Sequence, residues 1–191
     1  MFLLEYIKNP RYVGAVAPSG KHLANEMISE IDFENAKCII EYGPGTGAFT
    51  EKILSRVNNE TIVILIEINK EFYSELKKLY GHKKNVIILN SSAENIDIIL
   101  KRYSISDVDY IVSGLPFASL PKNVSKSILK KTSDLIKGKG KFITFQYSLI
   151  KVKFINKFFN KVNYSKVLMN FPPAYVLICE EDNYEETYIS S

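Results

Sequence analysis

The sequence has no tryptophan, only two cysteines and only two histidines. Cys38 and Cys179 lie in apolar segments, where a free thiol packs as a small hydrophobic side chain, and two such residues build no disulfide framework. His22 and His82 have no partners at metal-ligand spacing, so we expect no metal site. The sequence also lacks an apolar run of about 18 residues, which excludes a membrane-spanning helix, and it lacks the features of a secretory signal. We therefore expect a cytoplasmic protein.

The charge of the chain is distributed unevenly along its length. The 191 residues, the length of one domain, carry a net charge of only +4. Between residues 122 and 166, however, there are twelve lysines and only one acidic residue, Asp134, whereas five of residues 180–186 are acidic. This asymmetry favours a polyanionic partner such as RNA or an anionic bilayer.

Apolar runs and helical patterns alternate along the chain. The runs cover residues 38–40, 62–68, 85–89, 108–115 and 141–147. They are continuous rather than alternating, which is typical of parallel strands buried on both faces. The helical patterns between them predict an α/β fold with a doubly wound sheet. Near the C-terminus, KVLMN and AYVLICEE flank two prolines and predict an antiparallel hairpin that closes the sheet.

A glycine-rich turn follows the first predicted strand. In EYGPGTG, Gly43, Gly45 and Gly47 allow a tight turn and a close approach of ligand to backbone. Glu67 ends the second predicted strand, where a carboxylate can accept hydrogen bonds from both ribose hydroxyls. The loop lacks the glycine spacing of a dinucleotide site and the lysine of a P-loop. Glu41 would repel a pyrophosphate but suits a cationic ligand with a free amino group, as in S-adenosylmethionine.

This turn, together with Glu67, closely resembles motif I and the following acidic motif of class I S-adenosylmethionine-dependent methyltransferases. The resemblance implies a Rossmann-like, mostly parallel seven-stranded sheet with helices on both faces, and S-adenosylhomocysteine as product. It also implies a cofactor-binding core at 36–191 and a helical segment at 1–35 that covers the substrate or contacts the membrane. Ser92 stands where the family often has Asp next to adenine. The cofactor-binding residues expected from the resemblance are Glu41, Tyr42, Gly43, Gly45, Gly47, Glu67, Ile68, Ser92, Ala93, Glu94 and Ser113.

The stretch SGLPFASLP, residues 113–121, separates two kinds of methyl acceptor. It lies where the similar ribosomal RNA adenine dimethylases carry Asn-x-Pro-Tyr. The Asn of that motif accepts a hydrogen bond from the amine of the base, and the Tyr ring stacks on the flipped base. Gly114 stands at the Asn position and Phe117 at the aromatic position. Those enzymes also have an additional C-terminal helical domain for RNA, whereas this sequence ends after its predicted hairpin. Both features count against RNA.

The bacterial phospholipid N-methyltransferases resemble the sequence nearly end to end, through NPRYVGAVAPS, EYGPGTGAFT, SGLPFASLP and NFPPAYV. The resemblance implies methylation of phosphatidylethanolamine or its methylated forms. An aliphatic amine has a pKa of roughly 10 and must lose a proton before it attacks. Tyr147 is the candidate catalytic residue that orients or deprotonates it; the alternative is a tyrosine packed at a sheet edge. The expected substrate-binding residues are Tyr12, Gly114, Leu115, Pro116, Phe117 and Phe171.

The segment KVKFINKFFNKV, residues 151–162, has the pattern of a basic amphipathic helix. Lys153, Lys157 and Lys161 recur every four residues, and Phe158 and Phe159 belong to the apolar face. Such a helix suits the inner face of a membrane, and the alternative is a helix packed on the protein's own core. Two further functions remain open: an RNA adenine N6-methyltransferase, and a peripheral membrane protein that binds S-adenosylmethionine without catalysis.

Overall fold

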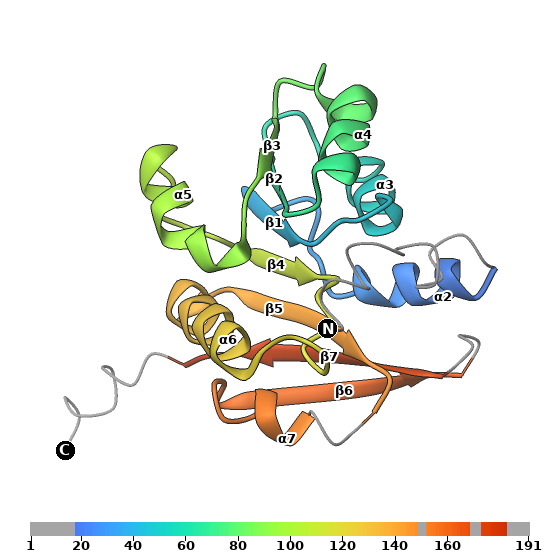
Figure 1. Cartoon of the computed structure of the whole chain (residues 1–191), viewed down its shortest axis with the longest axis vertical. Helices are drawn as coiled ribbons and strands as arrows, with labels where there is room; N and C mark the ends of the chain where they lie inside the picture. Colours follow the sequence, from blue (N-terminus) through green and yellow to red (C-terminus); the bar gives the residue numbers. More distant parts are fainter. Residues whose placement is uncertain (1–17, 149–151, 169–172, 183–191) are drawn as a thin grey trace.

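Seven strands form one sheet in the computed structural model, which describes residues 18–148, 152–168 and 173–182 (Figure 1). The order of the strands is β3-β2-β1-β4-β5-β7-β6. Tyr12, Phe171 and residues 1–17 of the helical segment predicted at 1–35 lie outside the described residues. The strands are β1 (Cys38–Tyr42), β2 (Ile62–Glu67), β3 (Val86–Asn90), β4 (Tyr110–Ser113), β5 (Lys141–Gln146), β6 (Lys161–Val167) and β7 (Ala174–Glu180).

The pairing of the strands confirms a mostly parallel sheet that ends in an antiparallel hairpin. Strands β1 to β5 pair in parallel, with β1 between β2 and β4. Strand β7 runs antiparallel between β5 and β6. All five residues of β1 are buried, as expected for a continuous apolar strand covered on both faces.

Helices cover both faces of the sheet (Figure 1). On one face, the core cluster that includes Ile99, Ile128 and Ile155 joins the sheet to α5, α6 and α7. On the other face, the cluster that includes Met27, Ile53 and Leu76 joins it to α2, α3 and α4. The described helices are α2 (Pro18–Met27), α3 (Ala48–Leu54), α4 (Lys70–Tyr80), α5 (Ile96–Arg102), α6 (Lys122–Ile136), α7 (Val152–Ile155) and the short 3-10 helix η2 (Ala93–Asn95).

The amphipathic helix predicted at 151–162 is wrong. Helix α7 has only four residues, and Lys161 already belongs to β6, where it pairs with Glu180 of β7. Phe159 is buried in the core and stacks on Phe142 of β5, with a centroid distance of 5.4 Å and an interplanar angle of 18°. Lys161 Nζ lies 3.1 Å from a carboxylate oxygen of Glu180. Of the residues whose spacing predicted a helix, Lys161 therefore pairs with the neighbouring strand of the hairpin, and Phe159 packs in the core.

Lys153 and Lys157 remain exposed on and after α7. In the described part of the chain, no helix is both long and apolar enough to cross a bilayer.

Candidate cofactor and methyl-acceptor site

The glycine turn connects β1 to α3 through three residues with left-handed backbone. Gly43, Gly45 and Gly47 have φ of 62°, 56° and 87°, a region that residues with a Cβ rarely adopt. Gly43 N donates to Ile66 O over 2.9 Å, which ties the turn to β2. A Cβ added to Gly45 would meet no atom of the described residues within 4 Å, so the turn faces open space among them at that residue. This open space provides room for a ligand against the backbone.

Glu67 is fixed beside the turn by two backbone groups. One carboxylate oxygen accepts from Gly45 N at 2.9 Å and the other from Asn69 N at 2.8 Å. The side chain is only 5% exposed, and its burial raises the pKa while the two backbone hydrogen bonds oppose that rise. A carboxylate has about four acceptor sites, so about two remain for the hydroxyls of a ribose.

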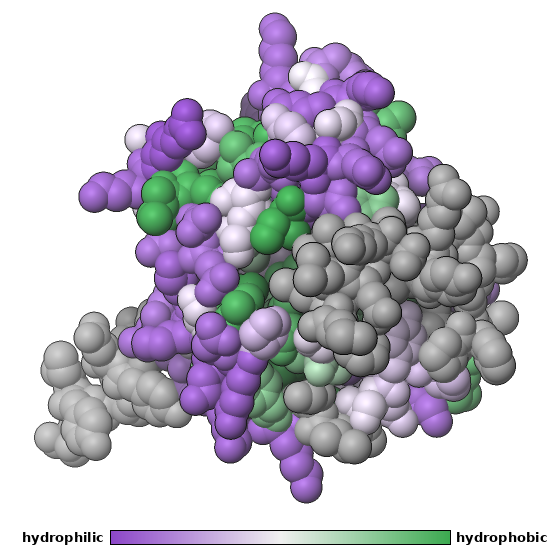
Figure 2. Space-filling model, in the orientation of Figure 1, coloured by the Kyte–Doolittle hydropathy of each residue, from purple (hydrophilic) through white to green (hydrophobic). Residues whose placement is uncertain are grey.

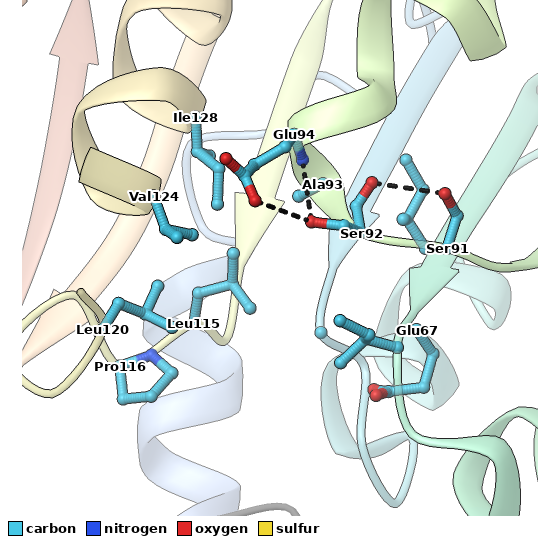
Figure 3. Close-up of a pocket in the computed structure, with 13 residues that line it drawn as sticks. Glu67, Ser91, Ser92, Ala93, Glu94, Leu115, Pro116, Leu120, Val124 and Ile128 are labelled. Atoms are coloured by element: carbon cyan, nitrogen blue, oxygen red, sulfur yellow. Dashed lines mark hydrogen bonds between the residues drawn. The ribbon is translucent and has the colours of Figure 1, made fainter. Parts of the chain in front are cut away.

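A pocket opens beside Glu67, at the carboxyl ends of β1, β2 and β3 (Figure 3). Glu67 lies on one side of it, while Leu120, Val124 and Ile128 form an apolar wall on the other. In the space-filling view, hydrophobic residues are exposed at the centre of this face among hydrophilic ones (Figure 2). The lining residues are Gly43, Ile66, Glu67, Ile68, Ser91, Ser92, Ala93, Glu94, Leu115, Pro116, Leu120, Val124 and Ile128.

The segment after β3 is fixed beside the pocket by hydrogen bonds within the segment and by a lysine of α6. Ser92 Oγ accepts from Glu94 N at 3.2 Å and lies 3.5 Å from Glu94 Oε2 (Figure 3). From α6, Lys131 Nζ donates to Glu94 O at 2.6 Å and to Asp97 at 2.7 Å. Helix α6 therefore supports the segment expected to flank adenine. Sequence reasoning missed this role of Lys131, because its spacing indicated only a charged position on an amphipathic helix.

Glu41 lies in the protein interior and does not line the pocket. It is fully buried, and its Oε2 accepts from Thr50 Oγ1 of α3 at 2.7 Å. Its Oε1 has no hydrogen-bond partner among the residues that the structure describes. Burial raises the pKa of Glu41 to about 8, and the negative charge of Glu67 adds to the rise. Its expected contact with the amino group of the cofactor stays a prediction.

The side chains of Tyr42 and Phe117 both belong to the core. Tyr42 is fully buried, and its hydroxyl accepts from Thr132 Oγ1 of α6 at 3.4 Å. Phe117 is 1% exposed and packs edge-on against Phe142, with centroids 6.1 Å apart. The ring of Phe117 is therefore not available to stack on a base or line the acceptor site in this structure.

Ser113 and Gly114 join the end of β4 to the glycine turn. Ser113 is buried, and its Oγ accepts from Leu115 N at 3.2 Å. Gly114 N donates to Tyr42 O at 2.9 Å, and a Cβ added to Gly114 would lie 2.7 Å from Gly43 O. Contacts below 3.0 Å essentially never occur for a Cβ, so an Asn at position 114 requires the backbone to move.

Tyr147 follows β5 and is 45% exposed. Its ring meets Phe145 edge-on at 5.5 Å, and Phe145 meets Phe49 of α3 edge-on at 6.0 Å. Phe49 lies two residues after Gly47. The three rings therefore form an aromatic row that starts beside the glycine turn, at the carboxyl edge of the sheet. The distance from Tyr147 to a methyl acceptor stays untested.

This strand order, the left-handed glycine turn and the fixed carboxylate at the end of β2 define a class I S-adenosylmethionine-dependent methyltransferase. Solved structures with the same fold include the N-methyltransferase NodS from Bradyrhizobium japonicum, with a TM-score of 0.70 and 9% identity over 89% of this chain and all of that one. A putative RNA methyltransferase from Pyrococcus horikoshii has a TM-score of 0.62 and 18% identity over 84% of each chain.

Residues 19–167 match the family model of the ribosomal RNA adenine dimethylases, and the chain belongs to that family. One relative is an ornithine lipid N-methyltransferase from Singulisphaera acidiphila, which is 28% identical over 94% of both chains. Another is the ribosomal RNA small subunit methyltransferase A of Mycoplasma capricolum, which is 29% identical over 68% of this chain and 47% of the relative. The chain thus spans about half the length of the ribosomal RNA enzymes that it matches.

Proposed function

We propose that this protein transfers methyl groups from S-adenosylmethionine to the amine head group of a membrane lipid, such as phosphatidylethanolamine or an ornithine lipid. The observation that carries the proposal is Gly114. A base clamp needs an acceptor side chain at this position, and the close contact with Gly43 O leaves no room for one. Similarity to the ornithine lipid enzyme along 94% of both chains supports the same substrate class.

S-adenosylmethionine supplies a methyl group already activated on a sulfonium centre. In this proposal Glu67 accepts hydrogen bonds from the ribose hydroxyls, and the hydrogen bonds from Gly45 N and Asn69 N, which fix its orientation, support that role. The apolar wall of Leu120, Val124 and Ile128 suits the flat adenine ring. What the protein must add is mainly orientation, because holding a nucleophile against an activated donor supplies much of the rate.

The acceptor amine must arrive without its extra proton. An alkyl ammonium with a pKa of roughly 10 is mostly protonated at neutral pH, and only the free lone pair can attack the methyl carbon. Tyr147 has a half-exposed hydroxyl-bearing ring at the carboxyl edge of β5, where it is a candidate to orient the amine or pass its proton to water. Successive methylated products stay cationic, and the row of Phe49, Phe145 and Tyr147 offers aromatic faces that attract such cations.

Adenine in ribosomal RNA is the second candidate acceptor, because the family model and several relatives are RNA enzymes. A flipped base needs hydrogen-bond acceptors at its edge and an aromatic ring on its face. Gly114 has no side chain that could accept a hydrogen bond from the base, and the ring of Phe117 is buried against Phe142. These two features favour the aliphatic amine over the base.

The decisive experiment offers both acceptors to the purified protein with methyl-labelled S-adenosylmethionine. One reaction contains vesicles of phosphatidylglycerol with phosphatidylethanolamine or an ornithine lipid, and the other contains unmodified ribosomal RNA. Parallel reactions with Glu67→Gln protein, which lacks the fixed carboxylate, measure the background. Label in the lipid extract is the expected result. Label in the RNA alone would overturn the proposal.

A further inference from the structure

Strand β6 ends at the same edge of the sheet as the cofactor pocket. Strands β5 and β6 both run antiparallel to β7, so they are parallel to each other and to β1. The carboxyl ends of β1, β4, β5 and β6 therefore share one edge. Val167 pairs with Ala174 there, while Tyr175 pairs with Gln146 at the end of β5.

The outer strand β6 exposes an unusual set of side chains on one of its faces. Because side chains alternate along a strand, Tyr164 and Lys166 point to the same side, and Leu168 follows directly after the strand. Tyr164 is 56% exposed and Leu168 is 69% exposed. Tyr175 of β7 joins them: its ring lies 6.2 Å from that of Tyr164, and Lys166 Nζ lies 5.9 Å from its centroid. Aromatic residues with a polar tip and lysines with long apolar stems are suited to a membrane interface.

Helix α7 lies on this same face. Tyr175 packs against the core cluster that includes Val152 and Ile155 of α7, and Phe154 and Phe158 pack against it as well. Lys153 and Lys157 are exposed, and no ion pair joins them or Lys166 to an acidic residue in the described ranges. The nearby acid Glu180 is paired with Lys161, and Glu181 accepts from Asn160 N. Lys153, Lys157 and Lys166 are therefore exposed cationic positions on the side of the sheet where Tyr164 is exposed.

We propose that this face, defined by Tyr164, Lys166, Leu168, Lys153 and Lys157 and called the hairpin face below, docks the protein on an anionic lipid bilayer. The cationic rim complements anionic head groups, and Leu168 and Tyr164 reach into the interface between them. Docking here brings the lipid surface to the edge where the pocket opens, as a lipid acceptor requires. The inference rests on the proposed function, but the contact itself is measurable without catalysis.

Two variants separate the parts of the contact. Lys153, Lys157 and Lys166 are replaced together by Gln, with the triple change of Lys77, Lys78 and Lys84 to Gln as a control of equal charge. Each lysine near an anionic surface contributes about 1 kcal/mol, so the hairpin-face variant should bind phosphatidylglycerol-rich vesicles on the order of 100-fold more weakly. The control should bind within a few-fold of wild type, and circular dichroism and thermal unfolding check that both variants are folded.

The second variant, Tyr164→Ser with Leu168→Ser, keeps the charge and removes the apolar contact. It should weaken vesicle binding at low and high salt alike, which binding to RNA phosphates would not show. Sedimentation with vesicles measures both variants, and methyl transfer to lipid in detergent micelles measures their catalysis. Unchanged vesicle binding by both variants would overturn the hairpin face while leaving the proposed function intact. Lost vesicle binding with no lipid methylated by any form of the protein would keep the docking surface and overturn the function.

An edge strand can also pair with a second copy of the chain. If light scattering reports a dimer for the wild type and a monomer for the double Ser variant, the hairpin face is a dimer interface and the membrane proposal fails. A wild type and variant of the same size, together with the loss of vesicle binding, support the proposal.

Discussion

Replacing Glu67 by Gln should reduce both stability and cofactor affinity. The carboxylate accepts two buried backbone hydrogen bonds, from Gly45 N and Asn69 N, one on each oxygen. A Gln amide has one oxygen and one NH₂ group, so one of the two backbone donors would face another donor. Leaving a buried donor unpaired costs about 1–3 kcal/mol. Part of this cost is offset, because removing the negative charge of Glu67 relieves its repulsion of the buried Glu41.

The affinity for S-adenosylhomocysteine should fall by a free energy comparable to the loss of stability. Hydrogen bonds to a charged acceptor contribute about 1.5–3 kcal/mol, and neutral ones about 0.5–1.5 kcal/mol. The difference for two ribose hydroxyls predicts a Kd raised about 10- to 100-fold, measured by titration calorimetry. Glu71→Gln is the matched control, because Glu71 lies on the exposed first turn of α4 and carries the same charge. An unchanged Kd for Glu67→Gln would refute the assignment of the ribose to this carboxylate.

The remaining predictions concern four other positions, with Lys157 as the control for one of them. Gly114→Asn should lower the free energy of unfolding by about 1–3 kcal/mol without creating activity on ribosomal RNA, because its Cβ would press on Gly43 O; a gain of RNA methylation would contradict this. Glu41 has a pKa of about 8 in the folded protein against 4.5 ordinarily, so the folded state holds a proton that the unfolded state loses, and the stability of the cofactor-free protein should fall as pH rises from about 4.5 to about 8. Chemical unfolding across that range should show a shallower decline for Glu41→Gln. Lys131→Met should raise the KM for S-adenosylmethionine several-fold with little change in kcat, because it releases Glu94 O and Asp97; an equal loss in kcat would indicate a wider role. Phe159→Ala should destabilise the fold by about 3–5 kcal/mol and Lys157→Ala by less than about 0.5 kcal/mol, as thermal unfolding will test.

The sequence predicted those features that depend on local pattern. The continuous apolar runs gave the parallel strands, and the spacing between the glycine turn and Glu67 identified two parts of the site that the sheet then brings together. Both parts of the site lie at the ends of neighbouring parallel strands, and the ends of such strands must meet at one edge of the sheet.

The errors arose where a distant partner decided the outcome. The apolar positions from Val152 to Val162 fit a helical period, but β6 forms because β7, residues 174–180, pairs with it. For Tyr42 and Phe117, a motif gave the position in the chain but not the direction of the side chain. Tyr42 ends a strand buried on both faces, where apolar residues point both ways, and Phe117 lies in the turn after β4, so the sequence pattern does not indicate which side chain meets the pocket and which meets the core.

The contact between Gly114 and the glycine turn links the choice of acceptor to the binding of the cofactor. Gly114 N is bonded to Tyr42 O, and its Cα faces Gly43 O so closely that no Cβ fits between them. A planar base requires a side-chain acceptor at this point, so a base-clamping enzyme must hold its acceptor loop farther from the glycine turn. An aliphatic amine requires only that its lone pair align with the methyl group. The close contact is therefore compatible with an amine acceptor, and a variant that restores the clamp must move the cofactor loop first.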